Sequence, residues 1–176
     1  MLKIFTTQLS GFFKRIEEQE EFQFEDAARI LAQASVGEGF IYIYGVEEMH
    51  AIPLEALSSA EPLSQAKALP LHELDQLTSV DRVLLVSRFS TDNKAVEIAE
   101  RLKKRDIPFV SIAAVPKEIV EPSLTALADA HIDTKLLKPL IPGEDGSRFG
   151  FPAMMVALYA YYGLTFTLKE IVEEYE

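Results

Sequence analysis

Cysteine is absent from the 176-residue sequence, which excludes disulfide bonds and thiolate metal sites and is typical of a reducing compartment. The three histidines have no His-x-x-x-His or similar spacing, so we expect no metal site and no other cofactor. The longest apolar run, residues 153–162, is far too short to span a bilayer. Residues 1–15 carry Lys3, Lys14 and Arg15 and so lack the unbroken apolar segment of a signal peptide. We therefore expect a cytoplasmic protein.

Positive charge is also scarce. Lysine and arginine number 17 against 28 aspartates and glutamates, and the formal net charge is −11. A strongly acidic chain repels nucleic acid and anionic membranes, so we expect neither as a partner. The same charge repels phosphorylated ligands at long range. Any phosphate site must therefore be local, made by backbone N–H groups and hydroxyls.

Hydrophobic periodicity and turn residues predict one domain over residues 1–176. Its parts are N-terminal helices in residues 1–36, a parallel-sheet core in residues 39–135 and C-terminal helices in residues 147–176. The predicted helices cover residues 2–16, 25–35, 48–58, 93–105, 122–128, 152–163 and 167–175, and the predicted strands cover residues 40–44, 63–69, 82–86, 107–112 and 131–134. Such alternation is typical of an α/β fold with a doubly wound sheet and helices on both faces.

Two loops of this predicted fold are candidates for a ligand site. In doubly wound sheets, ligands bind beyond the carboxyl ends of the strands, where the strand order reverses. Residues 45–50 follow the first predicted strand, and residues 87–92 lie between a buried strand and an amphipathic helix. Both loops therefore have the position that a binding site needs.

The loop of residues 87–92 contains three hydroxyls, Ser87, Ser90 and Thr91, next to a helix start. Free N–H groups and the positive end of the helix dipole favour an anion there, and Arg88 could add a charge-assisted contact. The alternative is that these residues only cap the helix, since serine, threonine and aspartate are preferred N-caps.

The loop of residues 45–50 begins with Gly45, which permits a tight turn. The Gly-x-Gly-x-x-Gly nucleotide pattern is absent, because Glu47 stands in place of the second glycine. His50 is a candidate general acid or base, and Glu55 is a candidate for proton transfer between neighbouring sugar carbons. The alternative for both is an ordinary surface residue.

The C-terminal part contributes one more candidate ligand and one candidate interface. Arg148 lies in a glycine-flanked loop and could close over an anion, although an ordinary loop arginine is the alternative. The helix expected from Pro152 to Gly163 is apolar nearly all round, which indicates burial in its own domain or against a second subunit. We therefore expect a homodimer. A capping box at Thr167 predicts a separate terminal helix.

Residues 39–45 and 83–99, each a strand followed by a helix, resemble the corresponding segments of sugar isomerase (SIS) domains. The leading helices and the final helical pair are most similar to the phosphoheptose isomerase branch. The resemblance implies a five-stranded parallel sheet in a flavodoxin-like three-layer sandwich. It also implies dimers or tetramers, with a phosphosugar bound by hydroxyls that follow two of the strands.

The SIS loops match only in part. Ser87 matches the first residue of the family's Ser-Thr-Ser-Gly-like loop, and Ser90 and Thr91 are shifted substitutes for its later hydroxyls. In the first loop Gly45 matches the family's first glycine, and His50 matches a histidine of phosphoheptose isomerases. The residues that replace family residues are Glu47, Met49, Arg88 and Phe89, and no histidine lies in residues 153–162, where those enzymes carry a second one.

Three functions follow as hypotheses. The first is aldose–ketose isomerisation of a sugar phosphate such as sedoheptulose 7-phosphate, through an enediol. The second is a non-catalytic phosphosugar-binding or regulatory module that has lost the isomerase residues. The third is another flavodoxin-like protein, such as a flavin binder or a phosphoacceptor. A phosphoacceptor normally has an aspartate at the end of a strand, whereas the two main strands here lead into Gly45 and Ser87.

Overall fold

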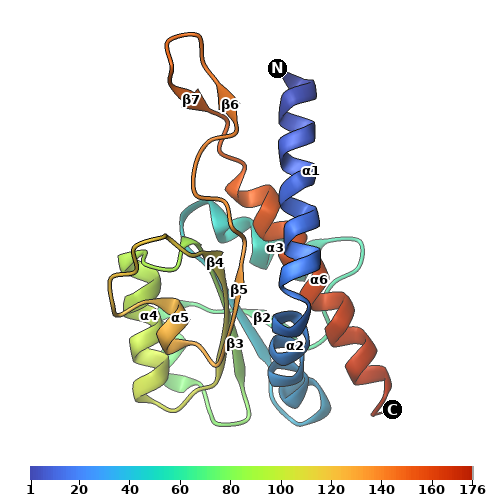
Figure 1. Cartoon of the computed structure of the whole chain (residues 1–176). Helices are drawn as coiled ribbons and strands as arrows, with labels where there is room; N and C mark the ends of the chain where they lie inside the picture. The colour runs from blue at the N-terminus through green and yellow to red at the C-terminus, as the bar shows by residue number, and fades with distance from the viewer. Residues whose placement is uncertain (176) are drawn as a thin grey trace.

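The computed structural model describes residues 1–175, and Figure 1 shows their arrangement. The helices are α1 (Leu2–Gln19), α2 (Glu21–Val36), η1 (Glu47–His50), α3 (Ala51–Ser58), η2 (Leu71–Gln76), α4 (Asn93–Lys104), α5 (Leu124–Leu127) and α6 (Ala153–Glu173), where η marks a 3-10 helix. The strands are β1 (Ile41–Gly45), β2 (Ala66–Ala68), β3 (Arg82–Phe89), β4 (Phe109–Ala114), β5 (Ala130–Asp133), β6 (Ile141–Pro142) and β7 (Arg148–Phe149).

The central sheet has five parallel strands in the order β2-β1-β3-β4-β5, which confirms the predicted doubly wound α/β fold. The inner strands β3 and β4 are buried along almost their whole length, as expected for strands covered on both faces. The chain leaves β1 for the edge strand β2 and then returns to β3. The strand order therefore reverses between β1 and β3, and a ligand of such a fold binds at that point.

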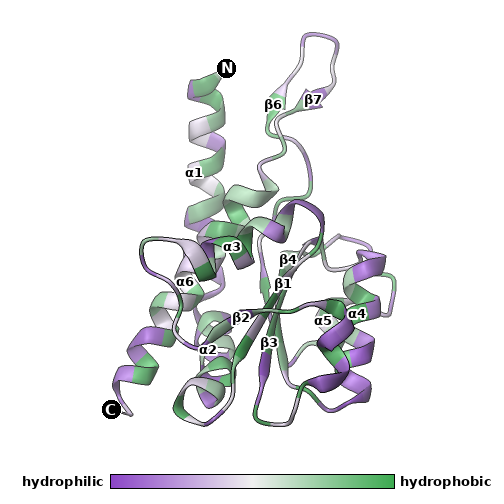
Figure 2. Ribbon diagram, turned by 180° about the vertical axis from the view of Figure 1, so that it is seen from behind, coloured by the Kyte–Doolittle hydropathy of each residue, from purple (hydrophilic) through white to green (hydrophobic). Residues whose placement is uncertain are grey.

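Helices cover both faces of the sheet and enclose two cores (Figure 1). One core lies under α1, α2, α3 and α6 and includes Ile43 and Val110. The other lies under α4, α5 and η2 and includes Leu85 and Leu102. Figure 2 shows apolar strands at the centre and hydrophilic residues on the outer side of α4. This distribution is the one that the predicted amphipathic helix of residues 93–105 requires.

The helix α6 runs unbroken from Ala153 to Glu173, so the predicted stop at Gly163 and the predicted new helix at Thr167 are both wrong. Gly163 is needed for close packing, because a Cβ at this position would lie 2.9 Å from the Cζ atom of Phe24 on α2. Thr167 does not cap a helix either. Its hydroxyl donates a hydrogen bond of 3.0 Å to the carbonyl of Gly163 within the continuing helix.

The N-terminal half of α1 and the β6–β7 hairpin project together from the rest of the molecule (Figure 1). The hairpin falls in the predicted loop before α6 and pairs Ile141 with Phe149. At the other end of α1, the gap between the predicted helices of residues 2–16 and 25–35 narrows to Glu20, since α1 reaches Gln19 and α2 begins at Glu21. None of the helices within residues 1–175 is both long and apolar enough to cross a membrane.

Candidate functional site at the β1–β3 switch point

The two predicted loops do lie side by side, at the carboxyl ends of the neighbouring strands β1 and β3. The strands pair in register, with Gly45 opposite Val86. The pairing continues past the end of β1, because the backbone N–H of Val46 donates to the carbonyl of Val86 at 2.8 Å. The strand-order rule therefore located the two loops correctly.

Gly45 allows the turn η1 to fold back over the end of β1. A Cβ at Gly45 would lie 1.8 Å from the carbonyl oxygen of Met49, so only glycine fits beneath this turn. Glu47 has a φ of +53°, in the left-handed region that glycine prefers. Glu47, which stands where the SIS pattern has a glycine, thus has a backbone conformation that favours glycine.

Arg88 and Glu48 join the two loops through a bidentate ion pair. The Arg88 Nε atom lies 2.8 Å from Glu48 Oε1, and its Nη2 atom lies 2.7 Å from Oε2. These hydrogen bonds lower the pKa of Glu48 and raise that of Arg88. The guanidinium of Arg88 is therefore at the expected edge of the sheet, but Glu48 neutralises its charge.

Ser87 belongs to the strand and not to the loop in which the sequence placed it, because β3 continues to Phe89. The extension follows from pairing with β4, which resumes at Phe89 and Ala114 after an irregularity. The Ser87 hydroxyl is buried and donates a 2.7 Å hydrogen bond to the carbonyl of Phe89. The Phe89 ring packs against Phe151, two residues before α6, with centroids 6.0 Å apart.

Ser90, Thr91 and Asp92 connect β3 to α4. Asp92 occupies the N-cap position, but its carboxylate accepts a 3.2 Å hydrogen bond from the Phe89 N–H and makes no cap bond to the helix. Thr91 is half-buried. The Ser90 side chain is fully buried, and its hydroxyl has no hydrogen-bond partner among residues 1–175. The helix-capping alternative therefore does not account for the hydroxyls of this loop.

The two acid–base candidates, His50 and Glu55, lie on different faces of the sheet. The exposed ring of His50 packs edge-on against Tyr44, with centroids 5.3 Å apart, and Tyr44 adjoins the core under α4. Glu55, on α3, accepts a hydrogen bond from the Tyr162 hydroxyl of α6, on the opposite face. This bond raises the pKa of Tyr162. The two side chains do not converge on one reacting centre.

Arg148 lies in β7, within the hairpin that projects from the molecule (Figure 1). Its Nε and Nη2 atoms donate hydrogen bonds of 2.8 and 2.7 Å to the carbonyls of Pro139 and Leu140. These bonds tie the two sides of the hairpin together. The contacts of Arg148 are therefore those of a structural loop residue.

A buried polar pair on β4 and β5 was not anticipated from the sequence. The Ser111 hydroxyl lies 2.7 Å from His131 Nδ1, and His131 Nε2 lies 3.2 Å from the carbonyl of Ala113. A carbonyl only accepts, so Nε2 carries the proton and Nδ1 accepts from Ser111. Burial lowers the pKa of His131 to about 4. The ring is neutral and fully bonded, and its role in this arrangement is structural.

Two further polar clusters adjoin the strand ends. Lys135 pairs with the buried carboxylate of Glu20 and also lies 3.6 Å from Asp133. After β4, the buried Ser123 hydroxyl lies 2.7 Å from Thr125 Oγ1. The pairing of Lys135 with Glu20, 115 positions apart in the chain, could not be read from any sequence spacing. Within residues 1–175, no group of three or more histidines, aspartates or glutamates has the geometry of a metal site.

Solved structures define the class of this fold. A proposed phosphosugar isomerase involved in capsule formation, from Bacteroides fragilis, superposes with a TM-score of 0.70 at 16% identity, over 99% of this chain and 93% of that one. Vibrio vulnificus NanR, solved with ManNAc-6P, gives 0.68 at 18% identity over 97% of this chain and 62% of the NanR chain. Phosphoheptose isomerase GmhA from Neisseria gonorrhoeae gives 0.58 at 12% identity, over 93% and 94%. The chain therefore has the α/β fold of SIS domains.

The family itself follows from the sequence match. The chain belongs to the family described as Domain of unknown function (DUF2529), whose model matches residues 1–172. It is 43% identical over 175 residues to "Uncharacterized protein YwjG" of Bacillus subtilis (strain 168), and the match covers 99% of both chains. This similarity to YwjG extends over the strands, both candidate loops and α6.

Proposed function

We propose that this protein binds a sugar phosphate, or a related anionic small molecule, at the carboxyl ends of β1, β3 and β4. The phosphate would lie at the first turn of α4 and bond to the hydroxyls of Ser90 and Thr91. Arg88 would supply a positive charge from the end of β3. The wider family resemblance, in which hydroxyls after two strands bind a phosphosugar, supports the same position.

The unpartnered hydroxyl of Ser90 is the observation on which this proposal rests. Leaving a buried hydroxyl unpaired costs about 1–3 kcal/mol, so such a group in a folded protein needs an explanation. Ser90 stands at the end of β3, directly before a helix N-terminus that has no side-chain cap. An anion bound there would satisfy both the hydroxyl and the free N–H groups of α4.

Access to Ser90 would require movement of the segment that follows β4. The N–H of Leu124 donates to the Ser90 carbonyl at 2.8 Å, which holds this segment against the site. The apolar side chains of Ile119 and Val120, earlier in the same segment, are exposed. Moving Ile119 and Val120 would lose little apolar burial, but Leu124 is fully buried in the core under α4, so such a movement would have to leave residues 123–124 in place.

We favour the non-catalytic form of this function over isomerisation. General acid–base catalysis requires each group within hydrogen-bond reach of the proton that it moves. His50 and Glu55 are bound to partners on opposite faces of the sheet and cannot both reach one substrate in this arrangement. A sensor or regulatory module needs only the binding pocket. The isomerase hypothesis is retained as the second outcome of the test below.

The test is thermal unfolding in a panel of sugar phosphates that includes sedoheptulose 7-phosphate, with the unphosphorylated sugars and inorganic phosphate as comparisons. A ligand at about 100 times its Kd should add roughly 2.7 kcal/mol of stability. Ser90→Ala and Thr91→Val should weaken binding about tenfold, since each removes a hydrogen bond to a charged group. Thr7→Val is the matched control, because Thr7 bonds within α1.

Three outcomes of this test bear on the proposal. Stabilisation only by phosphorylated sugars, lost in the two site variants, would support it. Turnover of sedoheptulose 7-phosphate in a coupled assay, abolished by His50→Ala, would establish the isomerase instead. If no phosphorylated sugar binds below millimolar concentration, or if the site variants bind like Thr7→Val, the proposed site is wrong.

We also propose a homodimer, in which the projecting end of the molecule is the contact surface. The apolar first half of α6, from which a dimer was predicted, is covered mainly by α1 and α2 of its own chain. Exposed apolar side chains instead gather on α1 and near the hairpin: Leu2, Ile4, Phe149 and Met155. Light scattering at micromolar concentration tests this. A monomer, or a dimer that Leu2→Ser/Ile4→Ser leaves intact, would contradict it.

A further inference from the structure

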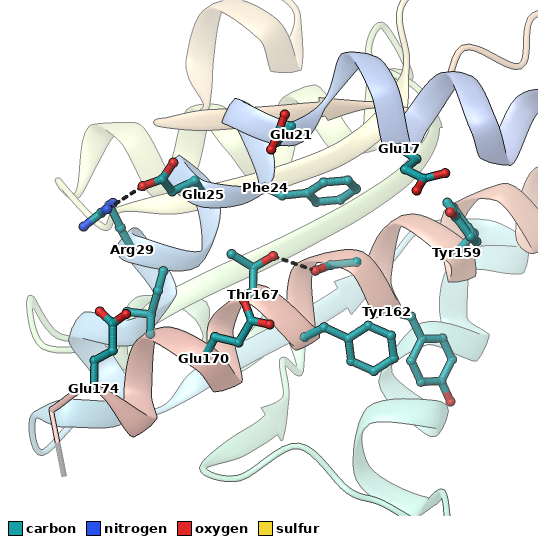
Figure 3. Close-up of a pocket in the computed structure, with 13 residues that line it drawn as sticks. Glu17, Glu21, Phe24, Glu25, Arg29, Tyr159, Tyr162, Thr167, Glu170 and Glu174 are labelled. Atoms are coloured by element: carbon teal, nitrogen blue, oxygen red, sulfur yellow. Dashed lines mark hydrogen bonds and ion pairs between the residues drawn. The ribbon is translucent and has the colours of Figure 1, made fainter.

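Two hollows lie side by side along the C-terminal half of α6, away from the loops of the proposed phosphate site. The first, about 570 Å³, lies between α6 and the α1–α2 corner (Figure 3). The second, about 670 Å³, lies between α6, α3 and residues 59–65. Tyr162 and Phe166 line both hollows and therefore form the ridge between them. Each hollow has the size of a ligand pocket.

The ridge between the hollows is aromatic and unusually exposed. The Tyr162 and Phe166 rings lie 5.7 Å apart, and Phe166 is 61% exposed. The residues of α6 and its C-cap that line the first hollow form one stripe along the helix: Tyr159, Tyr162, Gly163, Phe166, Thr167, Glu170, Ile171 and Glu174. Within this stripe Tyr159 stacks on Phe13 of α1 and Gly163 packs against Phe24 of α2, whereas Phe166 is left uncovered.

Negative charge surrounds the ridge. Among the described residues that line the two hollows, eight are glutamates and two are cations, Arg29 and Lys169. Both cations already have partners, since Arg29 pairs with Glu25 and Lys169 lies 3.9 Å from Glu173. Figure 3 shows glutamates on both walls of the first hollow, Glu21 from α2 and Glu170 from α6. An apolar ridge within an acidic rim is complementary to a basic, amphipathic occupant.

We propose that this double hollow, defined as the surface of Tyr162 and Phe166 with the glutamates around them, is a docking site for a basic amphipathic helix of a partner protein. Apolar side chains spaced three or four apart on that helix would fill the hollows on either side of the ridge. Lysines and arginines on its flanks would pair with the glutamate rim, which would steer association and fix the orientation.

Charge also decides against a second copy of this chain as the occupant. Pairing this face with itself would bring the two glutamate rims together, and like charges in close contact across an interface cost several kcal/mol. The apolar end of α1, proposed above as the dimer contact, is a different surface.

The experiment uses a fluorescein-labelled amphipathic Leu/Lys peptide of about 18 residues, or five helical turns, and a Leu/Glu peptide of the same length. Fluorescence anisotropy is measured against the full chain at about 0.15 M salt, where surface charges are screened beyond about 8 Å. The Leu/Lys peptide should bind, and the Leu/Glu peptide should not. Phe166→Ser should weaken binding about tenfold, while Phe22→Ser, which removes an exposed phenylalanine of α2 outside the hollows, should not.

A charge-matched pair of variants separates docking from general attraction. Glu21→Gln/Glu170→Gln removes two charges from the rim, and Glu97→Gln/Glu100→Gln removes two from α4, on the other face of the sheet. The rim variant should lose at least fivefold in affinity, and the α4 variant less than twofold. Equal losses, or binding unaffected by Phe166→Ser, would overturn the proposal. A dimer dissociated by Phe166→Glu would also overturn it, because a second copy would then occupy this face.

Discussion

Gly163 of α6 faces the ring of Phe24 on α2 so closely that a Cβ at position 163 would lie 2.9 Å from the Phe24 Cζ atom. This contact lets α2 and α6 pack against each other on one face of the sheet. Gly163 lies between Tyr162 and Phe166, so this part of α6 also carries the aromatic ridge. A glycine in a long helix is therefore explained by its neighbour across the helix pair.

Replacing Gly163 with alanine should destabilise the fold by about 1 kcal/mol. Alanine gains about 1 kcal/mol of helix propensity over glycine, but forcing an extra methyl against a buried ring costs about 1–3 kcal/mol. Urea unfolding measures the difference. Adding Phe24→Leu, which shortens the opposing side chain, should recover part of the loss.

Gly11 is the matched control for this prediction. It also lies inside a helix, but a Cβ at Gly11 would meet nothing within 4 Å. Gly11→Ala should therefore stabilise the protein by up to about 1 kcal/mol, through helix propensity alone. If both alanine variants changed stability in the same direction, the contact with Phe24 would not be the reason for Gly163.

The order of the elements could be predicted from the sequence because it depends on local patterns. The apolar strand before Gly45 and the βαβ unit of residues 82–114 have clear periodicity, and the strand-order rule then places two loops together. The prediction that Gly163 ends a helix was wrong. In the local sequence, a glycine that ends a helix cannot be told apart from a glycine inside a helix that allows close packing. Only the position of Phe24 distinguishes them, and that position is set by the tertiary fold.

The candidate site could be located from the sequence, but its contacts could not. Ser87 was expected in a loop, yet β3 extends beyond it because β4 offers Ala114 as a partner for Phe89. The neutralisation of Arg88 depends on how η1 folds back over Gly45 and so presents Glu48. Such contacts join segments far apart in the chain, and a single sequence contains no signal for them.

Replacing Glu47 with glycine should stabilise the protein by about 0.5–1 kcal/mol. Left-handed backbone costs a non-glycine residue roughly 1–2 kcal/mol of folded-state stability, which glycine would recover. Part of this gain is lost because glycine has more conformational freedom in the unfolded state. Glu38→Gly is the control, since Glu38 is not among the residues with positive φ, and it should destabilise. Thermal unfolding that shows the same sign for both would contradict the strain at Glu47.

The buried His131 should make the protein less stable as the pH falls from 6.5 toward 4. The pKa of this ring drops from its ordinary value of 6.5 to about 4 on folding, chiefly because of burial, while Asp133 opposes the shift and Lys135 adds to it. Between these values the unfolded chain binds more protons than the folded one, so stability falls with pH. The loss is on the order of 3 kcal/mol at most.

Urea unfolding at pH 7.5 and pH 5 measures this loss. In His131→Gln, a side-chain amide can donate to Ala113 and accept from Ser111 without titrating, so the dependence on pH should shrink. His72→Gln is the control, because His72 is exposed and lies 3.6 Å from Glu73 at the surface. An undiminished pH dependence in His131→Gln would assign the effect to other groups.

Replacing Glu48 with glutamine should tighten the binding of a sugar phosphate severalfold, because it frees the charge of Arg88 beside the proposed site. The ion pair is substantially exposed, so its loss should change stability by less than about 1 kcal/mol. Titration calorimetry with the best ligand of the panel measures the gain. Glu100→Gln on α4 removes the same formal charge at a distant surface and controls for the general reduction in repulsion. The gain should disappear in Glu48→Gln/Arg88→Gln; if it persists there, or if Glu100→Gln matches it, Arg88 does not contact the phosphate.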